Sequence, residues 1–111
     1  MFPTHYAVTA RLPSSELAVE YLDWLGSGGH LQAVIDGGAS SACAVRLDPA
    51  PHESAMPVRI MSLYTFPSRE AFAAYERDHA PALRADGVAR FGDRGIEFER
   101  TTGEIVTALG S

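Results

Sequence analysis

The segment Tyr75-Glu-Arg-Asp-His-Ala-Pro-Ala-Leu-Arg84 decides how this sequence is interpreted. The apolar and aromatic positions around it recur at spacings of three and four, as on one face of a helix: Phe72, Tyr75, His79 and Leu83. Pro81 removes an amide donor and disfavours helical geometry at Ala80. The sequence therefore predicts a helix that bends or restarts between Asp78 and Pro81.

Four strands are predicted outside this helix. Residues 5–12 and 58–66 alternate apolar or aromatic with other side chains, and prolines border both runs. Residues 40–47 form a third strand before a proline-bounded connection. The fourth is expected at about residues 95–101, with Gly103 in a turn.

A second helical region fills the gap between the first two strands. Ser14 or Ser15 can cap a helix that runs to Leu25. Its apolar side chains fall in one arc at 100° per residue: Leu17, Ala18, Tyr21, Leu22, Trp24 and Leu25. Glycines at positions 26–29 interrupt it, and a short helix is expected over residues 30–35. The order βαββαβ indicates an α+β fold in which the helices cover one face of a four-stranded antiparallel sheet.

The other face of that sheet has a mixed character. It would carry the alternate residues of the strands: Ala7, Thr9, Arg11, Arg59, Met61, Leu63, Thr65, Glu97 and Glu99. Its centre is too apolar to remain in water, whereas its arginines and glutamates make the surface too charged for an ordinary core. We therefore expect a homodimer in which the two sheets face each other.

Composition restricts the class of protein. The 111 residues fit one domain over positions 1–111, and the formal net charge of −5 argues against nucleic acid as a partner. The sequence contains neither an apolar run long enough to span a membrane nor a secretory signal pattern, and its single cysteine, Cys43, permits no internal disulfide. We expect a cytoplasmic protein with no membrane partner.

Several blocks of the sequence resemble a small bacterial family of unknown function in the dimeric α+β barrel superfamily. They include residues 21–25, 41–48, 66–69, 90–92 and 100–103, and the most specific block is His-Ala-Pro-Ala-Leu-Arg at 79–84. This resemblance implies a ferredoxin-like fold that pairs as a dimeric barrel. The superfamily includes cofactor-free monooxygenases, isomerases, haem-degrading oxygenases and ligand-sensing domains. The glycines at 26–29 depart from the unbroken helix of many relatives.

Two histidines are candidate functional residues. His30 follows the glycine run, where its ring can transfer a proton or, alternatively, only begin the short helix. His79 lies on the apolar stripe, which favours a buried ring that bonds the backbone freed by Pro81; contact with a ligand is the alternative. We take His30 as the candidate catalytic residue.

The remaining candidates are placed around a pocket. Trp24, Tyr64 and Met61 would shape an apolar pocket, although Trp24 can equally belong to the core. Arg84, with Arg90, can clamp a carboxylate or tie the second helical region to the last strand. The pocket set is therefore Trp24, Met61, Tyr64, His79 and Arg84.

The sequence predicts no specific reaction. No cofactor motif and no metal-site spacing are found, so we expect neither cofactor nor metal. The leading interpretation is an uncharacterised dimer with a small-molecule-related role. A cofactor-free monooxygenase or isomerase acting on a small apolar substrate is one alternative and requires a cavity of roughly 300 Å³ or more. A ligand-binding or interaction module without catalysis is the other.

Overall fold

The computed structural model describes residues 2–110. Its strands are β1 (Thr4–Leu12), β2 (Ser41–Leu47), β3 (Val58–Phe66) and β4 (Glu97–Glu104). They form one antiparallel sheet in the order β2-β3-β1-β4. The helices are α1 (Ser15–Leu25), α2 (His30–Asp36), α3 (Arg69–Asp78) and α4 (Ala80–Phe91).

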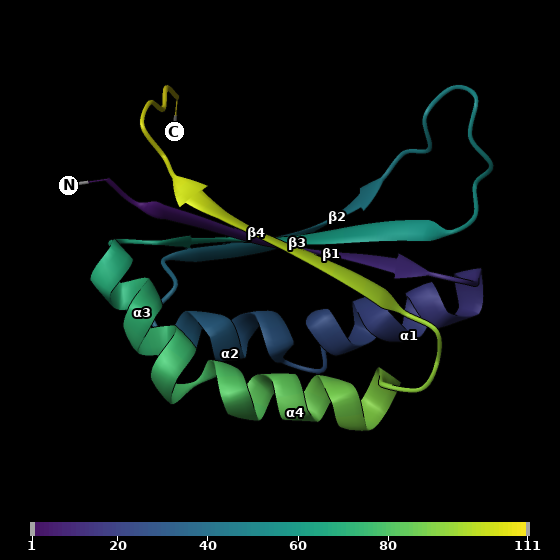
Figure 1. Cartoon of the computed structure of the whole chain (residues 1–111), viewed down its shortest axis with the longest axis horizontal. Helices are drawn as coiled ribbons and strands as arrows, with labels where there is room; N and C mark the ends of the chain where they lie inside the picture. The colour runs from purple at the N-terminus through teal and green to yellow at the C-terminus, as the bar shows by residue number, and fades with distance from the viewer. Residues whose placement is uncertain (1, 111) are drawn as a thin grey trace.

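All the helices lie on one side of the sheet (Figure 1). Each long gap between strands holds a pair of them, α1 with α2 and α3 with α4, so that the order βαββαβ is confirmed. A four-stranded antiparallel sheet with one helical layer is the ferredoxin-like arrangement that the sequence predicted. Only the last strand was misplaced: β4 continues to Glu104 and contains Gly103, which is paired with His5 rather than lying in a turn.

Serine hydroxyls fix where two of the helices begin. Ser14 Oγ accepts a hydrogen bond from the amide of Leu17 at 3.1 Å, and Ser68 Oγ accepts one from Ala71 at 3.1 Å. Each bond satisfies an amide that has no partner within the helix. The helix N-termini are therefore set locally, before any tertiary packing.

The predicted break near Pro81 is confirmed. His79, with φ −123° and ψ −41°, ends α3 and precedes α4, and Pro81 occupies the first turn of α4. Proline is tolerated there because the amides of a first helical turn have no intrahelical acceptor. The two helices consequently meet at an angle instead of forming one rod (Figure 1).

Strand register separates the side chains of the sheet into two sets. The even-numbered residues of β1 and β3 point toward the helices. Among them, Tyr6, Ala10, Ile60 and Tyr64 are buried. The opposite surface, which we call the open face, carries the alternate residues: His5, Ala7, Thr9, Arg11, Ser41, Cys43, Val45, Leu47, Arg59, Met61, Leu63, Thr65, Glu97, Glu99 and Thr101. The assignment of residues to this face agrees with the sequence prediction.

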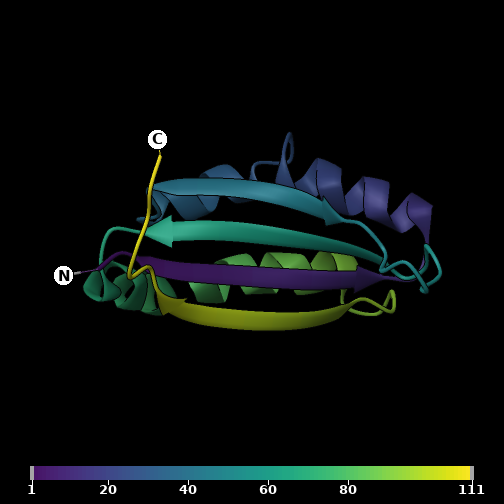
Figure 2. The same cartoon turned by 90° about the horizontal axis from the view of Figure 1, so that it is seen from above.

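The helical layer is uneven in depth. Helices α1 and α2 lie close to the sheet along its β2 edge, whereas α4 lies beneath β1 and further from the strands (Figures 1 and 2). Most side chains of α4 are exposed, and only Ala80 and Phe91 are buried. This loosely packed part of the helical layer is where the candidate site lies.

Candidate functional site

A cavity of about 330 Å³ lies between the sheet and the helices. Seven of its sixteen lining residues are aromatic, with rings from β1, α1, β3, α3, α4 and β4: Tyr6, Tyr21, Trp24, Tyr64, Tyr75, Phe91 and Phe98. Several of these rings contact one another, such as Tyr21 and Phe91 with centroids 5.6 Å apart. An aromatic wall with a few polar groups is typical of small-molecule sites.

His30 is the side chain of this cavity whose unperturbed pKa, 6.5, lies closest to neutral pH. Its ring stacks on Trp24, with centroids 4.0 Å apart and planes inclined by 22°. Burial lowers the pKa of His30 to about 4, although the Asp86 carboxylate opposes that shift. The imidazole is therefore neutral at pH 7 and retains a lone pair that can accept a proton.

Trp24 connects α1 with the outer helix α4. Its Nε1–H donates to Oδ2 of Asp86 at 3.0 Å, and the other carboxylate oxygen of Asp86 accepts from Arg90 Nε at 3.1 Å. The Trp24 and Arg90 hydrogen bonds lower the pKa of Asp86. Gly87, one residue further along α4, allows close approach, since a Cβ there would lie 3.3 Å from the indole ring. These contacts hold α4 over the cavity.

Three tyrosines of the cavity, Tyr21, Tyr64 and Tyr75, remain protonated at neutral pH. Burial raises the pKa of Tyr21 to about 12 and that of Tyr75 to about 12, and it raises the pKa of Tyr64 still further. Their phenols can therefore donate hydrogen bonds but cannot act as bases near pH 7. The cavity offers one neutral base, His30, among several hydroxyl donors.

Ser62 contributes a buried hydroxyl to the cavity. The residue is only 1% exposed, and within residues 2–110 its Oγ has no hydrogen bond of ordinary length. It nevertheless lies near the phenols of Tyr21 and Tyr64, where it slightly opposes the rise of their pKa values. A buried polar atom of this kind normally finds a partner.

The mouth of the cavity lies between α4 and β4, where its lining residues are exposed. Val88 on α4 and Phe98 on β4 are 69% and 43% exposed. Arg84 and Arg100 border the same opening from the two elements. The pKa of Arg84 is raised, chiefly by a hydrogen bond with the Tyr6 hydroxyl. A ligand that enters here passes two cationic side chains.

The structure brings together four of the six residues that the sequence singled out. Trp24, His30, Tyr64 and Arg84 all line the cavity. Met61 does not: it lies on the open face, because it is three residues from Tyr64 and side chains alternate along a strand.

His79 is also outside the cavity, and its predicted burial is wrong. The side chain is exposed and stacks near Tyr75, with centroids 6.4 Å apart, while Gly37 packs against its Cγ. The helix ends at His79, so the helical register does not continue through it, and Ala80 takes the buried position.

Of the two roles considered for Arg84 and Arg90, a tie between the second helical region and the last strand is wrong. Arg84 pairs with Glu76 at 2.8 Å and Arg90 with Asp86 at 3.1 Å. Both pairs lie within the α3–α4 region, so neither arginine ties that region to β4.

Sequence reasoning missed the polar groups Ser62, Asp86 and Arg100. Strand alternation puts Ser62 on the same face as Tyr64, and the same rule puts Arg100 beside Phe98. No sequence pattern marks Asp86, because its partner Trp24 is 62 residues away.

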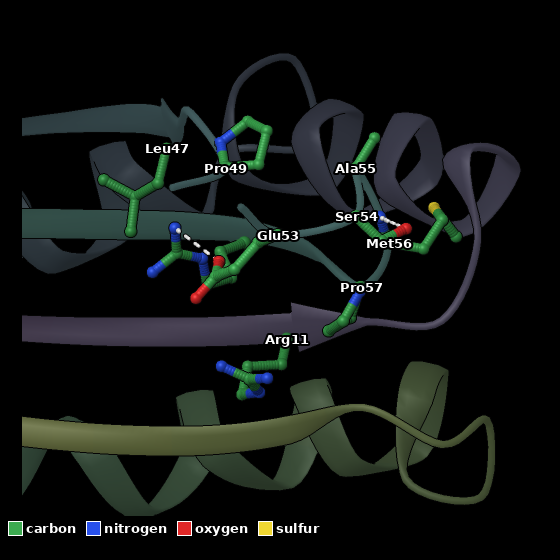
Figure 3. Close-up of a pocket in the computed structure, with 9 residues that line it drawn as sticks. Arg11, Leu47, Pro49, Glu53, Ser54, Ala55, Met56 and Pro57 are labelled. Atoms are coloured by element: carbon green, nitrogen blue, oxygen red, sulfur yellow. Dashed lines mark hydrogen bonds and ion pairs between the residues drawn. The ribbon is translucent and has the colours of Figure 1, made fainter. Parts of the chain in front are cut away.

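A second cavity, of about 270 Å³, lies beside the connection between β2 and β3 (Figure 3). Arg11 and Arg59 face each other across β1 and β3 there. Arg59 donates to the carbonyl oxygen of Asp48 at 2.9 Å and lies 3.8 Å from Glu53, and Arg11 lies 3.8 Å from a Glu97 oxygen. Because its arginines already contact acceptors within the chain, this cavity is the weaker candidate.

Residues 2–110 contain neither a cluster of metal ligands nor a helix that could span a membrane. No group of three or more His, Cys, Asp or Glu side chains is placed to hold a metal ion. No helix in this range has the length and apolar character that crossing a membrane requires.

Comparison with known proteins identifies the family. The model of a domain of unknown function, DUF4286, matches residues 4–105. The chain belongs to this family. No curated protein matches the chain. The DUF4286 assignment agrees with the resemblance to a family of unknown function that the sequence blocks indicated.

Solved structures resemble this DUF4286 protein over nearly its whole length. A dimeric ferredoxin-like protein from an uncultured marine organism covers 98% of this chain and 100% of its own, with TM-score 0.66 and 13% identity. SnoaB, a cofactor-independent oxygenase from Streptomyces nogalater, covers 100% of both chains, with TM-score 0.67 and 8% identity. An EthD-family protein from Bacillus halodurans covers 94% and 98%, with TM-score 0.63 and 17% identity. At these identities the similarity shows the fold alone.

Proposed function

We propose that the protein binds a small organic molecule in the aromatic cavity between its sheet and α4. The observation that carries this proposal is a space of about 330 Å³ lined by aromatic rings, with a buried Ser62 hydroxyl that lies near the Tyr21 and Tyr64 phenols but makes no hydrogen bond of ordinary geometry to them. Protein interiors are close-packed, so an aromatic cavity of this size is unusual unless it serves a ligand. Its volume exceeds the roughly 300 Å³ that we required of a site.

Trp24 provides the test of binding, because it is the only tryptophan in the chain and lines the cavity. A neutral two-ring probe, 2-naphthol, should change its fluorescence in a saturable manner. Gly87→Leu places a side chain in the cavity beside the indole and should abolish saturation. Ala85→Leu, on the exposed surface of the same helix, should bind as the wild type does. Equal binding by both variants would place the probe elsewhere and contradict the proposal.

A catalytic role is the second candidate, because His30 lines the cavity as a neutral imidazole, although its lowered pKa makes it a weaker base than a free histidine. A neutral imidazole in the cavity, beside tyrosines that stay protonated, can take a proton from a carbon or hydroxyl acid of the ligand. An isomerase would return that proton to another carbon, and a monooxygenase would react the resulting carbanion with molecular oxygen. The similarity in fold to SnoaB, a cofactor-independent oxygenase, is consistent with this chemistry.

Proton abstraction can be measured without knowing the substrate. The bicyclic ketone 2-tetralone has acidic C–H groups, and in deuterium oxide its exchange is followed by NMR. Wild-type protein should accelerate the exchange, His30→Gln should not, and His52→Gln, in an exposed loop, should match the wild type. If wild-type protein does not accelerate the hydrogen–deuterium exchange of 2-tetralone, the catalytic role is contradicted and the protein is a binding module without catalysis.

We further propose that the protein is a homodimer whose open faces pack together. Within one chain the apolar side chains Val45 and Leu63 on this face have no helical cover. A second copy would bury them, and a structural neighbour from an uncultured marine organism is described as dimeric.

We also propose that the protein is cytoplasmic. The thiol of Cys43 is exposed and free, so the fold needs no oxidising environment, which supports this location.

A further inference from the structure

The charges that line the cavity are of one sign. Arg84 and Arg100 border its mouth, and among the described residues no aspartate or glutamate lines its wall. His30 is neutral at pH 7, because burial lowers its pKa to about 4. The carboxylate that bonds the aromatic wall at Trp24, that of Asp86, lies outside the lining and also accepts from Arg90. The cavity therefore presents positive charge that its own lining does not neutralise.

Arg100 carries most of that uncompensated charge. Arg84 is paired with Glu76 at 2.8 Å, whereas none of the ion pairs found in residues 2–110 includes Arg100. The Arg100 guanidinium lies 5.7 Å from the centroid of the Phe98 ring, which also lines the mouth. A planar cation beside an aromatic ring can pair with a carboxylate whose own ring stacks on the wall.

A second polar group lies deeper in the same cavity. Ser62 points from β3 toward the helices, is 1% exposed and has no ordinary hydrogen-bond partner within residues 2–110. Leaving such a hydroxyl unpaired costs free energy that a bound polar atom would recover. A ligand that complements this cavity has a negative charge at the end that lies in the mouth and a hydrogen-bonding atom at the end that lies in the interior.

We propose that the cavity takes a small planar aromatic acid, with its anionic group at Arg100 and a second polar atom at Ser62. This inference rests on the proposed small-molecule binding and adds the class of ligand. A space of about 330 Å³ equals the volume of about eleven waters at about 30 Å³ each, which suits one or two fused rings.

Two isosteric probes test the charge. The compounds 2-naphthoate and 2-naphthamide have the same shape and differ by one negative charge. Calorimetric titration of the wild type at pH 7 should show the acid binding about tenfold more tightly than the amide, as expected for a hydrogen bond assisted by charge. Arg100→Gln should bring the ratio close to one.

Arg46→Gln is the matched control, because Arg46 is exposed on β2 and lies outside the cavity lining. It should leave the ratio unchanged. Equal affinity for acid and amide in the wild type would overturn the proposed ligand class and leave small-molecule binding intact. Failure of both naphthalenes and of 2-naphthol to perturb Trp24 would overturn binding itself.

The hydroxylated acid 6-hydroxy-2-naphthoate tests the deeper contact. Its hydroxyl lies at the opposite end from the carboxylate, and in the wild type it should strengthen binding several-fold over 2-naphthoate. Ser62→Ala should remove this gain, whereas Ser41→Ala on the open face should retain it. Thermal unfolding checks that Ser62→Ala remains folded, and truncating a hydroxyl without a partner is not expected to destabilise the chain. A gain that persists in folded Ser62→Ala would refute the Ser62 contact.

Discussion

At the scale of single residues, His30 makes the stability of the fold depend on pH. The folded protein lowers its pKa from 6.5 to about 4 through burial. Between these values the unfolded chain binds a proton that the folded chain does not, so the free energy of unfolding falls as pH drops from about 6.5 to about 4. The maximum loss is about 3 kcal/mol, since each pKa unit corresponds to about 1.4 kcal/mol.

Urea unfolding at pH 7 and at pH 4.5–5 measures this loss. His30→Gln should reduce the difference between the two pH values, because the glutamine does not titrate. His52→Gln should not alter it, since His52 lies in an exposed loop. Carboxylates such as Asp86 titrate in all three proteins, so their contribution to the pH dependence of the unfolding free energy cancels when the proteins are compared. A pH dependence identical in wild type and His30→Gln would show that the ring is solvated in the folded state.

The Trp24–Asp86 hydrogen bond gives a second prediction at this scale. Asp86→Ala leaves the indole N–H of a buried tryptophan without its acceptor, which should lower the free energy of unfolding. Asp86→Asn retains an oxygen acceptor and should cost less. Asp93→Ala, which removes an exposed carboxylate near the end of α4, is the control. Chemical unfolding monitored by Trp24 fluorescence measures all three, and equal stability of Asp86→Ala and Asp93→Ala would contradict the contribution of this bond.

The same residues show what a sequence can predict about a site. Amphipathic spacing correctly put Trp24 on the inner face of α1, and the glycine run correctly preceded a separate helix beginning at His30. Met61 was assigned to the pocket by residue type, although strand alternation alone already places it opposite Tyr64. Arg100 and Ser62 carry no sequence signal beyond that alternation, because their importance comes from the partners that they lack in three dimensions.

At the scale of elements, the junction between α3 and α4 marks the point beyond which helical spacing no longer predicts which side chains are buried. The stripe of Phe72 and Tyr75 is buried as the spacing predicts. The backbone departs from the helix at His79, so positions beyond it no longer keep the same angular register. Pro81 revealed that a break would occur, but the direction of the second helix depends on packing against α2.

Gly37 allows that packing and supports a prediction for this junction. A Cβ at position 37 would lie 3.0 Å from Cγ of His79 and 3.0 Å from Cδ1 of Tyr75. Gly37→Ala should therefore push the two rings aside by a few tenths of an ångström and lower the free energy of unfolding by about 1 kcal/mol. The φ of Gly37, −82°, suits alanine, so that backbone strain does not contribute.

Thermal unfolding compares Gly37→Ala with Gly103→Ala, at which a Cβ would meet nothing within 4 Å. The latter should be neutral or slightly stabilising. Adding His79→Ala to Gly37→Ala removes one of the two contacts and should recover part of the lost stability, although Tyr75 remains. Additive effects of the two substitutions would show that the rings do not meet position 37.

At the scale of the whole molecule, the two faces of the sheet have different tasks. The helical side encloses the cavity, and α4, which lies further from the strands than α1 and α2 (Figure 1), supplies part of its lining. The open face carries Leu63 at its centre, opposite Ala7 on β1 and Cys43 on β2. Because its centre is apolar and its charged residues, Arg11, Arg59, Glu97 and Glu99, gather at one end, it suits a second copy of itself better than water.

Leu63→Glu is the substitution that tests this arrangement. In a dimer with facing sheets it would bring two carboxylates into a desolvated centre, where unpaired charges cost several kcal/mol, so that the mutant should dissociate. Sedimentation equilibrium at micromolar concentration should give twice the 11.9 kDa chain mass for the wild type and a single chain for Leu63→Glu. Val19→Glu introduces the same charge at a 56% exposed position of α1, away from the sheet, and should remain dimeric. A wild-type protein that sediments as one chain would refute the dimer. A Leu63→Glu protein that stays dimeric would instead place the interface on the helical side, where it would compete with the mouth of the cavity between α4 and β4.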